Sequence, residues 1–200
     1  MTLDQFRSVA DRLLGPWVSA ADRLGLSPDQ VSLLAFVAAV LAAVAFALAE
    51  PLFYIAGALL VLLNGWFDLV DGALAREHDI ASDGGDLLDH VLDRYADIAV
   101  IAGFTAGIDA YALGFLAVTG VLMTSYLGTQ IQAVGIGREY GGLLGRADRL
   151  ALMGLVGVVA AVYPDPLVAN YGVVALLLAL FAVIGHLTAL QRFLGAWRDL

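Results

Sequence analysis

The sequence of 200 residues contains no cysteine and no lysine, and only three of its nineteen acidic residues are glutamate. Without cysteine, the chain can form neither disulfide bonds nor thiolate metal sites. Charged residues make up only 14% of the chain, whereas a soluble domain carries about 25%. The net charge of −9 also argues against nucleic acid as a partner, because the phosphate backbone attracts basic proteins.

The charges that are present are of two kinds, arginine and aspartate. All ten bases are arginine, and sixteen acids are aspartate. An acidic surface of this type suits a salt-rich cytoplasm, in which screening relieves self-repulsion, and it indicates an archaeal or halophilic source. A GC-rich genome that favours arginine and alanine codons is the alternative explanation.

Apolar runs dominate the rest of the chain, which is 61% hydrophobic. Several runs reach the roughly 20 residues that cross a bilayer as a helix. The sequence therefore predicts an all-α integral membrane protein with six transmembrane helices. The expected spans cover residues 31–48, 52–75, 86–108, 111–131, 149–163 and 171–190.

The first 25 residues are too polar to be a membrane span, but their apolar residues recur at helical spacing. This pattern predicts an amphipathic helix that lies in the membrane interface and is interrupted near Gly15 and Pro16. An amphipathic helix packed on protein is the alternative. Ser27 and Pro28 are typical of a helix start, and residues 26–200 are expected to form one six-helix catalytic domain.

The positions of the arginines predict the orientation. Nine of them fall on one side of the expected spans, and the three loops on the other side contain none: the nine are Arg7, Arg12, Arg23, Arg76, Arg138, Arg146, Arg149, Arg192 and Arg198. Because loops rich in arginine stay in the cytoplasm, both termini are expected to face the cytoplasm.

Aspartates cluster at the junction of the second and third expected spans. Asp68 and Asp71 are three residues apart and share one helix face, and Asp89 and Asp93, four apart, share a face of the next helix. The short connection predicts that these helices pack antiparallel, with both pairs at similar depth. Four such carboxylates suit Mg²⁺, Mn²⁺ or Ca²⁺, and nearby glycines at 72, 84 and 85 would admit a pyrophosphate.

Two further aspartates of this segment have structural interpretations. Asp86 is expected to cap the third span, with a role as a metal ligand as the alternative. Asp97 is expected to pair with Arg94 rather than to bind metal. Only Arg76 and Arg94 offer positive charge within residues 64–97, which leaves an excess of carboxylates that bound cations would neutralise.

The residues Asp68-x-x-Asp71-Gly72-x-x-Ala75-Arg76, then eight residues, then Gly85-x-x-x-Asp89-x-x-x-Asp93 resemble the signature of the CDP-alcohol phosphotransferases at every fixed position. The six expected spans and the amphipathic N-terminal helix are also similar to this family. The resemblance therefore covers nearly the whole chain.

The resemblance implies a homodimeric membrane enzyme whose site opens to the cytoplasm. The enzyme would transfer a phosphatidyl-type or archaetidyl group from a CDP-linked lipid to a polar alcohol and release CMP. Asp68, Asp71 and Asp89 would bind two Mg²⁺ or Mn²⁺ ions, and Asp93 would bridge to the second ion and act as the catalytic base. The residues implied to contact CDP are Gly72, Ala75, Arg76, Ser82 and Gly85.

The acceptor site is expected where the fourth and fifth spans meet. Two arginines near a helix start suit a phosphate, and the candidate acceptor-binding residues are Gln130, Arg138, Arg146 and Arg149. The stretch is similar to the inositol-phosphate-using branch in Ser125-Tyr126 and in the arginine pair. An Ala-Arg-Ala-Glu run of that branch is replaced by Thr129-Gln-Ile-Gln132. The sequence therefore favours a phosphorylated polyol such as inositol phosphate or glycerol phosphate. Anchoring of the loop at the lipid headgroups is the alternative role of these arginines.

Two other functions use similar residues. A membrane prenyltransferase also binds diphosphate through Mg²⁺ and aspartates, but its two acidic motifs are expected in different halves of a longer chain. A divalent-cation transporter would line a path with acids, whereas the first, fifth and sixth expected spans have none within their apolar cores.

Overall fold

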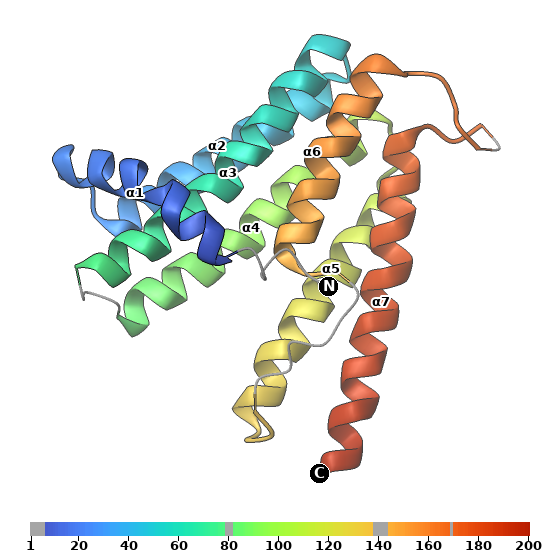
Figure 1. Ribbon diagram of the computed structural model, residues 1–200. Coiled ribbons are helices and arrows are strands. Elements are labelled where there is room, and N and C mark those ends of the chain that lie inside the picture. The colour runs from blue at the N-terminus through green and yellow to red at the C-terminus, as the bar shows by residue number, and fades with distance from the viewer. Residues whose placement is uncertain (1–6, 79–81, 138–143, 169) are drawn as a thin grey trace.

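The computed structural model describes residues 7–78, 82–137, 144–168 and 170–200, which form seven α-helices. These are α1 (Arg7–Arg23), α2 (Pro28–Leu48), α3 (Pro51–Glu77), α4 (Asp83–Gly107), α5 (Tyr111–Ala133), α6 (Arg146–Val162) and α7 (Val173–Asp199). Helices α2 to α7 alternate in direction, so the starts of α2, α4 and α6 lie on the same side as the ends of α3, α5 and α7 (Figure 1). The helix order therefore agrees with the predicted alternation.

The predicted start of α2 is confirmed in detail. Ser27 Oγ accepts from the Gln30 backbone N at 3.3 Å, and Gln30 Oε1 accepts from the Ser27 N at 2.9 Å. These reciprocal bonds satisfy two of the amide groups that a helix start leaves unpaired, and Pro28 supplies a residue without one. The cap fixes where α2 begins and thus where its polar first turns lie along the bundle axis.

Helix α2 packs against both α3 and α4, whereas α3 and α4 make little backbone contact with each other. The two helices run antiparallel, as predicted, but they are joined through α2 rather than packed directly on each other (Figure 1). The physical reason is the alanine-rich face of α2, since small side chains allow helices to approach closely. Its buried members are Ala35, Ala38, Ala39, Ala42 and Ala45.

The remaining helices complete the bundle. Helix α6 packs on α3, and α5 packs on α7. Phe46 of α2 and Phe104 of α4 stack with ring centroids 3.8 Å apart in the apolar core. A close backbone approach lies beside them, because a Cβ added at Gly103 would lie 2.3 Å from the carbonyl O of Ala43.

Four helices of the described residues, α2, α3, α5 and α7, are long and apolar enough to cross a membrane. Helix α6 has 17 residues. At about 1.5 Å per residue it spans roughly 25 Å, which is less than a 30 Å hydrocarbon core. Helix α4 carries several acids in its first half. Large apolar side chains such as Leu41 and Leu62 lie exposed on the outside of the bundle, as in an integral membrane protein.

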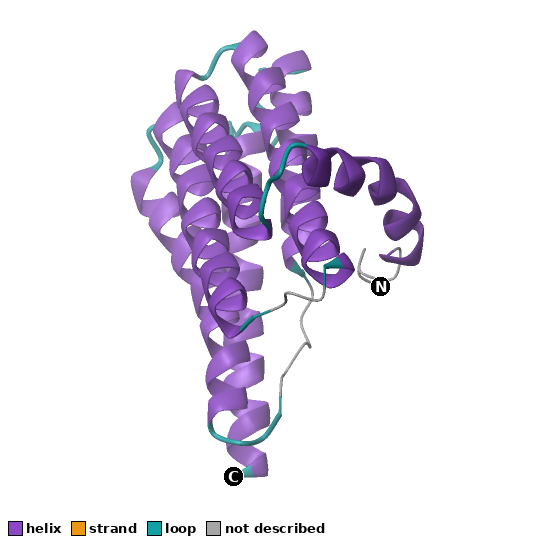
Figure 2. Cartoon of the chain, turned by 90° about the vertical axis from the view of Figure 1, so that its left-hand side faces the viewer, coloured by secondary structure: helices purple, strands orange, loops and turns teal. Residues whose placement is uncertain are grey.

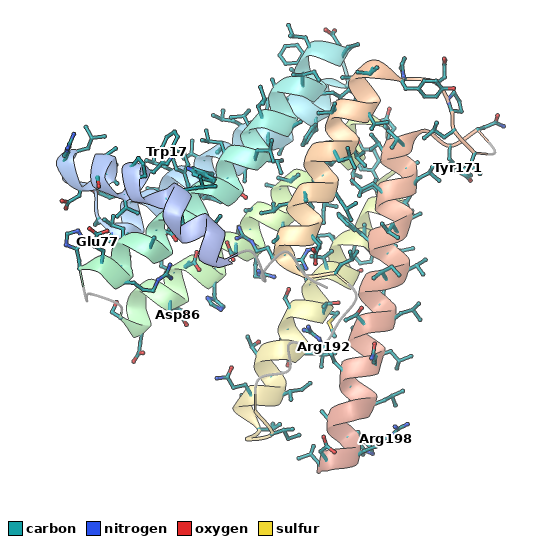
Figure 3. All side chains as sticks on the ribbon, viewed as in Figure 1. Trp17, Glu77, Asp86, Tyr171, Arg192 and Arg198 are labelled. Carbon is teal, nitrogen blue, oxygen red and sulfur yellow. The ribbon has the colours of Figure 1, made fainter. Side chains whose placement is uncertain are left out.

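Helix α1 lies to one side of the bundle and crosswise to it (Figure 2). It runs unbroken through Pro16, so the predicted interruption at Gly15 and Pro16 is wrong. Leu14 and Val18 are buried in a cluster with residues of α3. Trp17 meets Trp66 of α3 edge to face, with ring centroids 5.9 Å apart (Figure 3). Packing on protein thus holds α1 in place, whether or not a lipid interface covers its outer side.

We expect Gly103→Ala to destabilise the fold by about 1–3 kcal/mol, because its methyl group would force α2 and α4 apart. Gly15→Ala is the matched control, since nothing lies within 4 Å of a Cβ there. Thermal unfolding in detergent, followed by the loss of the monodisperse peak in size-exclusion chromatography, measures both. Equal midpoints for the two variants would contradict the close approach.

Candidate metal centre

Three aspartates from two helices meet at the centre of the site. Each of Asp68 and Asp71 of α3 and Asp89 of α4 offers a carboxylate oxygen, and these atoms all lie within 4.8 Å of one another. Three of the four aspartates predicted to form the site are thus brought together, whereas Asp93 is not part of this close group. Three carboxylate oxygens at this separation are the hard donors that Mg²⁺ and Mn²⁺ prefer, so the donor set fits a divalent ion.

Asp71 is the most buried member of this group, with 6% of its surface exposed. Ser32 of α2 donates a hydrogen bond from its Oγ to Asp71 Oδ2 at 2.6 Å. This bond satisfies one lone pair of a carboxylate that is otherwise shielded from water and fixes its rotamer. Helix α2 thus reaches the site directly through Ser32, a residue that was not predicted from the sequence.

Asp93 lies one helical turn beyond Asp89 and is joined to the cluster by an arginine. Arg146, the first residue of α6, places its Nη2 2.5 Å from Asp93 Oδ1 and its Nη1 2.7 Å from Asp68 Oδ1. Arg94 lies farther away, with its Nη2 3.5 Å from Asp93 Oδ2. Arg146 therefore links α3 to α4, because it contacts one carboxylate of each acidic pair: Asp68 on α3 and Asp93 on α4.

A second layer of charge lies deeper in the bundle. Asp97 has 1% of its surface exposed and pairs with Arg94 at 3.4 Å, as predicted, but also with Arg149 at the shorter distance of 2.9 Å. Arg94 in addition donates to Ser125 Oγ. Arg149 is itself 5% exposed, so it is held inside the bundle by Asp97 rather than presented at an open surface.

The residues assigned to CDP by resemblance lie around the end of α3 and the start of α4. A Cβ added at Gly72 would lie 3.3 Å from Arg76 Nη1, so the exposed Arg76 side chain turns back over this glycine. Ala75, also in the last turns of α3, is half-buried.

Ser82 caps α4, accepting from the Gly85 N at 3.1 Å. The predicted capping role of Asp86 is therefore wrong: Asp86 lies in the first turn with its side chain 75% exposed (Figure 3). A Cβ added at Gly85 would lie 3.4 Å from both Ser82 Oγ and Asp29 Oδ1, so the start of α4 lies close to the start of α2.

Two of the four predicted acceptor residues lie at the site, and the other two do not belong to the contacts described above. Arg146 and Arg149 belong to the charged layers described above, whereas Gln130 is exposed near the end of α5. Arg138 lies outside the described residues. Arg192 of α7, which was not selected as a site residue, donates from Nη1 to the carbonyl O of Thr124 at 2.5 Å and so ties α7 to α5 (Figure 3). An arginine that follows the long apolar run at the start of α7 was the signal that could have identified it.

Comparison with known proteins adds a family to this geometry. Residues 25–197 match the model of the CDP-alcohol phosphatidyltransferase family. The chain is 33% identical over 199 residues to archaetidylinositol phosphate synthase of Methanothermobacter thermautotrophicus, a match that covers 99% of this chain and 95% of that protein. It is 34% identical over 195 residues to phosphatidylinositol phosphate synthase of Mycolicibacterium smegmatis, covering 93% and 84%.

Crystal structures of Mycobacterium tuberculosis phosphatidylinositol phosphate synthase share the fold. The structure with CDP-DAG bound has a TM-score of 0.79 at 28% identity and covers 93% of this chain and 94% of that one. The structure in complex with manganese and citrate has a TM-score of 0.79 at 27% identity and covers 92% and 88%. The chain therefore belongs to the CDP-alcohol phosphatidyltransferase family and is a metal-dependent transferase of that family.

Proposed function

We propose that this enzyme transfers the phosphatidyl-type group of a CDP-linked lipid to inositol phosphate and releases CMP. The main support is the group formed by Asp68, Asp71 and Asp89, whose carboxylate oxygens lie within 4.8 Å of one another. The Arg146 guanidinium forms ion pairs with Asp68 and Asp93 beside this group. This arrangement supports a cation site beside an arginine that can bind an acceptor phosphate. The names of the relatives, which are phosphatidylinositol or archaetidylinositol phosphate synthases, support the acceptor.

The metal ligands in this proposal are Asp68, Asp71, Asp89 and Asp93, which supply enough oxygens for two Mg²⁺ or Mn²⁺ ions. When bound, such ions would neutralise the pyrophosphate and the charge that develops on the departing CMP. Ser32 keeps Asp71 oriented through its 2.6 Å hydrogen bond. The burial of Asp71 keeps competing water away from that side of the cluster.

The donor site lies at the junction of α3 and α4. Gly72 and Gly85 let the CDP moiety approach the backbone, Ala75 keeps that face small, and Arg76 binds the phosphates. Ser82 contacts the cytidine. Its oxygen accepts from the Gly85 N, and its own hydroxyl hydrogen can still be donated to a base.

The transfer is a displacement at the phosphorus on the lipid side of the pyrophosphate. The acceptor hydroxyl oxygen bonds to that phosphorus while the bond to the bridging oxygen breaks, and CMP leaves with that oxygen. The Asp93 carboxylate takes the proton of the hydroxyl. Gln130, Arg138, Arg146 and Arg149 are the residues proposed for the acceptor, with Arg149 anchored by Asp97.

The arrangement in the membrane is part of the proposal. Helices α2 to α7 cross the bilayer six times, α1 lies in the interface, and both termini and the site face the cytoplasm. The alternation of the helices and the arginines at one side of them support this orientation (Figure 1). As the family resemblance implies, the enzyme works as a homodimer.

We expect Asp93→Asn to lower CMP release from a CDP-lipid by about 10²- to 10⁴-fold, because the amide cannot accept the proton of the acceptor. Asp109→Asn is the matched control: Asp109 is exposed in the turn between α4 and α5 with a φ of 52°, a conformation that asparagine tolerates. The rate is measured with purified protein, Mg²⁺ and inositol phosphate. Wild-type turnover in Asp93→Asn would remove this residue from the role of base.

We expect inositol phosphate to be used about 10⁴-fold better than free inositol, because an arginine site built for a phosphate is left unpaired without it. CMP release in parallel reactions with inositol phosphate, glycerol phosphate, serine and free inositol measures this preference. CDP-diacylglycerol and CDP-archaeol serve as the two donors. Equal use of free inositol would contradict the proposed acceptor, and exclusive use of glycerol phosphate would replace it.

A further inference from the structure

Arg146 occupies a special position among the charged residues of the site. Its two terminal nitrogens contact carboxylates on different helices, Asp68 at 2.7 Å and Asp93 at 2.5 Å, and only 16% of its side chain is exposed. The start of α6 fixes its backbone, because the Gly145 N donates to Asp148 Oδ2 at 2.9 Å. The guanidinium is thus placed between the two acidic helices by the helix that carries it.

The neighbouring arginines also have partners outside the proposed metal ligands. Arg149, one turn further along α6, pairs at 2.9 Å with Asp97, which is almost fully buried and one turn beyond Asp93. Arg94 is shared among Asp93, Asp97 and Ser125. Both ion pairs of Arg146, in contrast, are made with carboxylates that the proposed function assigns to metal.

A divalent cation and the guanidinium would therefore draw on the same carboxylates. Asp68 Oδ1 and Asp93 Oδ1 each contact one nitrogen of Arg146, so a cation bound by these two carboxylates would lie close to the guanidinium, and the two positive groups would repel each other strongly at low dielectric. Metal binding at Asp68 and Asp93 would release the guanidinium. A released guanidinium at the start of a helix is well placed to bind a phosphate.

We propose that Arg146 is an exchangeable internal counter-ion, which neutralises Asp68 and Asp93 until divalent cations bind and then binds the phosphate of the acceptor. This inference rests on the proposed function and deepens it. It requires that the metal and the acceptor phosphate each strengthen the binding of the other. The metal displaces Arg146 from the carboxylates, and the phosphate binds the displaced guanidinium. By linkage the effect is reciprocal: the acceptor tightens metal binding by the same factor by which metal tightens acceptor binding.

The test measures Mn²⁺ binding rather than turnover. Free Mn²⁺ is followed by its electron paramagnetic resonance signal during titration of the purified full-length protein, without CDP-lipid, in the presence and absence of inositol phosphate. For the wild type, we expect the phosphate to tighten Mn²⁺ binding by about fivefold or more, a typical coupling between sites. Arg146→Gln should bind Mn²⁺ at least that much more tightly than the wild type, with no further effect of inositol phosphate.

Two further variants control the result. Arg146→Lys keeps the charge but cannot bridge two carboxylates, so its Mn²⁺ affinity should lie between those of the wild type and Arg146→Gln. Arg198→Gln removes the same charge from the exposed end of α7 and should match the wild type in affinity and coupling.

Unchanged or weaker Mn²⁺ binding in Arg146→Gln would overturn the exchange, as would a wild type that shows no coupling. If Arg146→Gln does not fold, Arg146→Lys decides, and equality with the wild type in both quantities would overturn the inference. The Asp68→Asn variant distinguishes a failure of the proposed exchange from a failure of the proposed function. A wild type that binds no Mn²⁺, or an Asp68→Asn variant that binds it equally well, would overturn both; normal metal binding with an inert Arg146 would overturn only the exchange.

Discussion

Attraction between the carboxylates of α3 and α4 and the arginines of α6 holds the functional part of this protein together. Arg146 pairs with Asp68 and Asp93, and one turn deeper Arg149 pairs with Asp97. Charges within an apolar bundle cost several kcal/mol each by rough estimate when they lack a partner. The two layers of ion pairs therefore fix how α6 lies against α3 and α4. The backbone of α6 packs on α3 but makes little contact with α4.

The apolar part of the bundle positions these charges. The alanine face of α2 and the backbone approach at Gly103 bring α4 close to α2, which also packs on α3. Since α3 and α4 make little contact with each other, their aspartate side chains meet across a separation that α2 sets. A direct α3–α4 interface would bring the carboxylates together without room for ions and a pyrophosphate between them.

The sequence predicts the features that depend on local spacing. Aspartates three and four residues apart identify the faces of α3 and α4 that meet, and Ser27 with Pro28 marks the start of α2. The partners that come from distant segments could not be predicted in this way. Ser32 meets Asp71 across 39 residues of sequence, and Arg149 meets Asp97 across 52, so both contacts depend on how the helices assemble.

Two local predictions failed because another interaction outweighed the one that the local sequence favours. Asp86 follows an aspartate and two glycines that can all enter the helix, so the earlier Ser82 became the cap and α4 gained a turn of polar residues. Pro16 did not interrupt α1, because Leu14 and Val18 on either side of it are both buried in the cluster shared with α3. Tertiary packing outweighed the local preference of proline in this helix.

The position of α2 between the two acidic helices and the lipid has a mechanical consequence. Leu33 and Leu41 of this helix face outward, whereas its opposite face packs on α3 and α4 and carries the Ser32 hydroxyl. Ser32 links α2 to the metal group through its bond to Asp71, so a shift of α2 against α3 would break this bond and turn the Asp71 carboxylate away from Asp68 and Asp89.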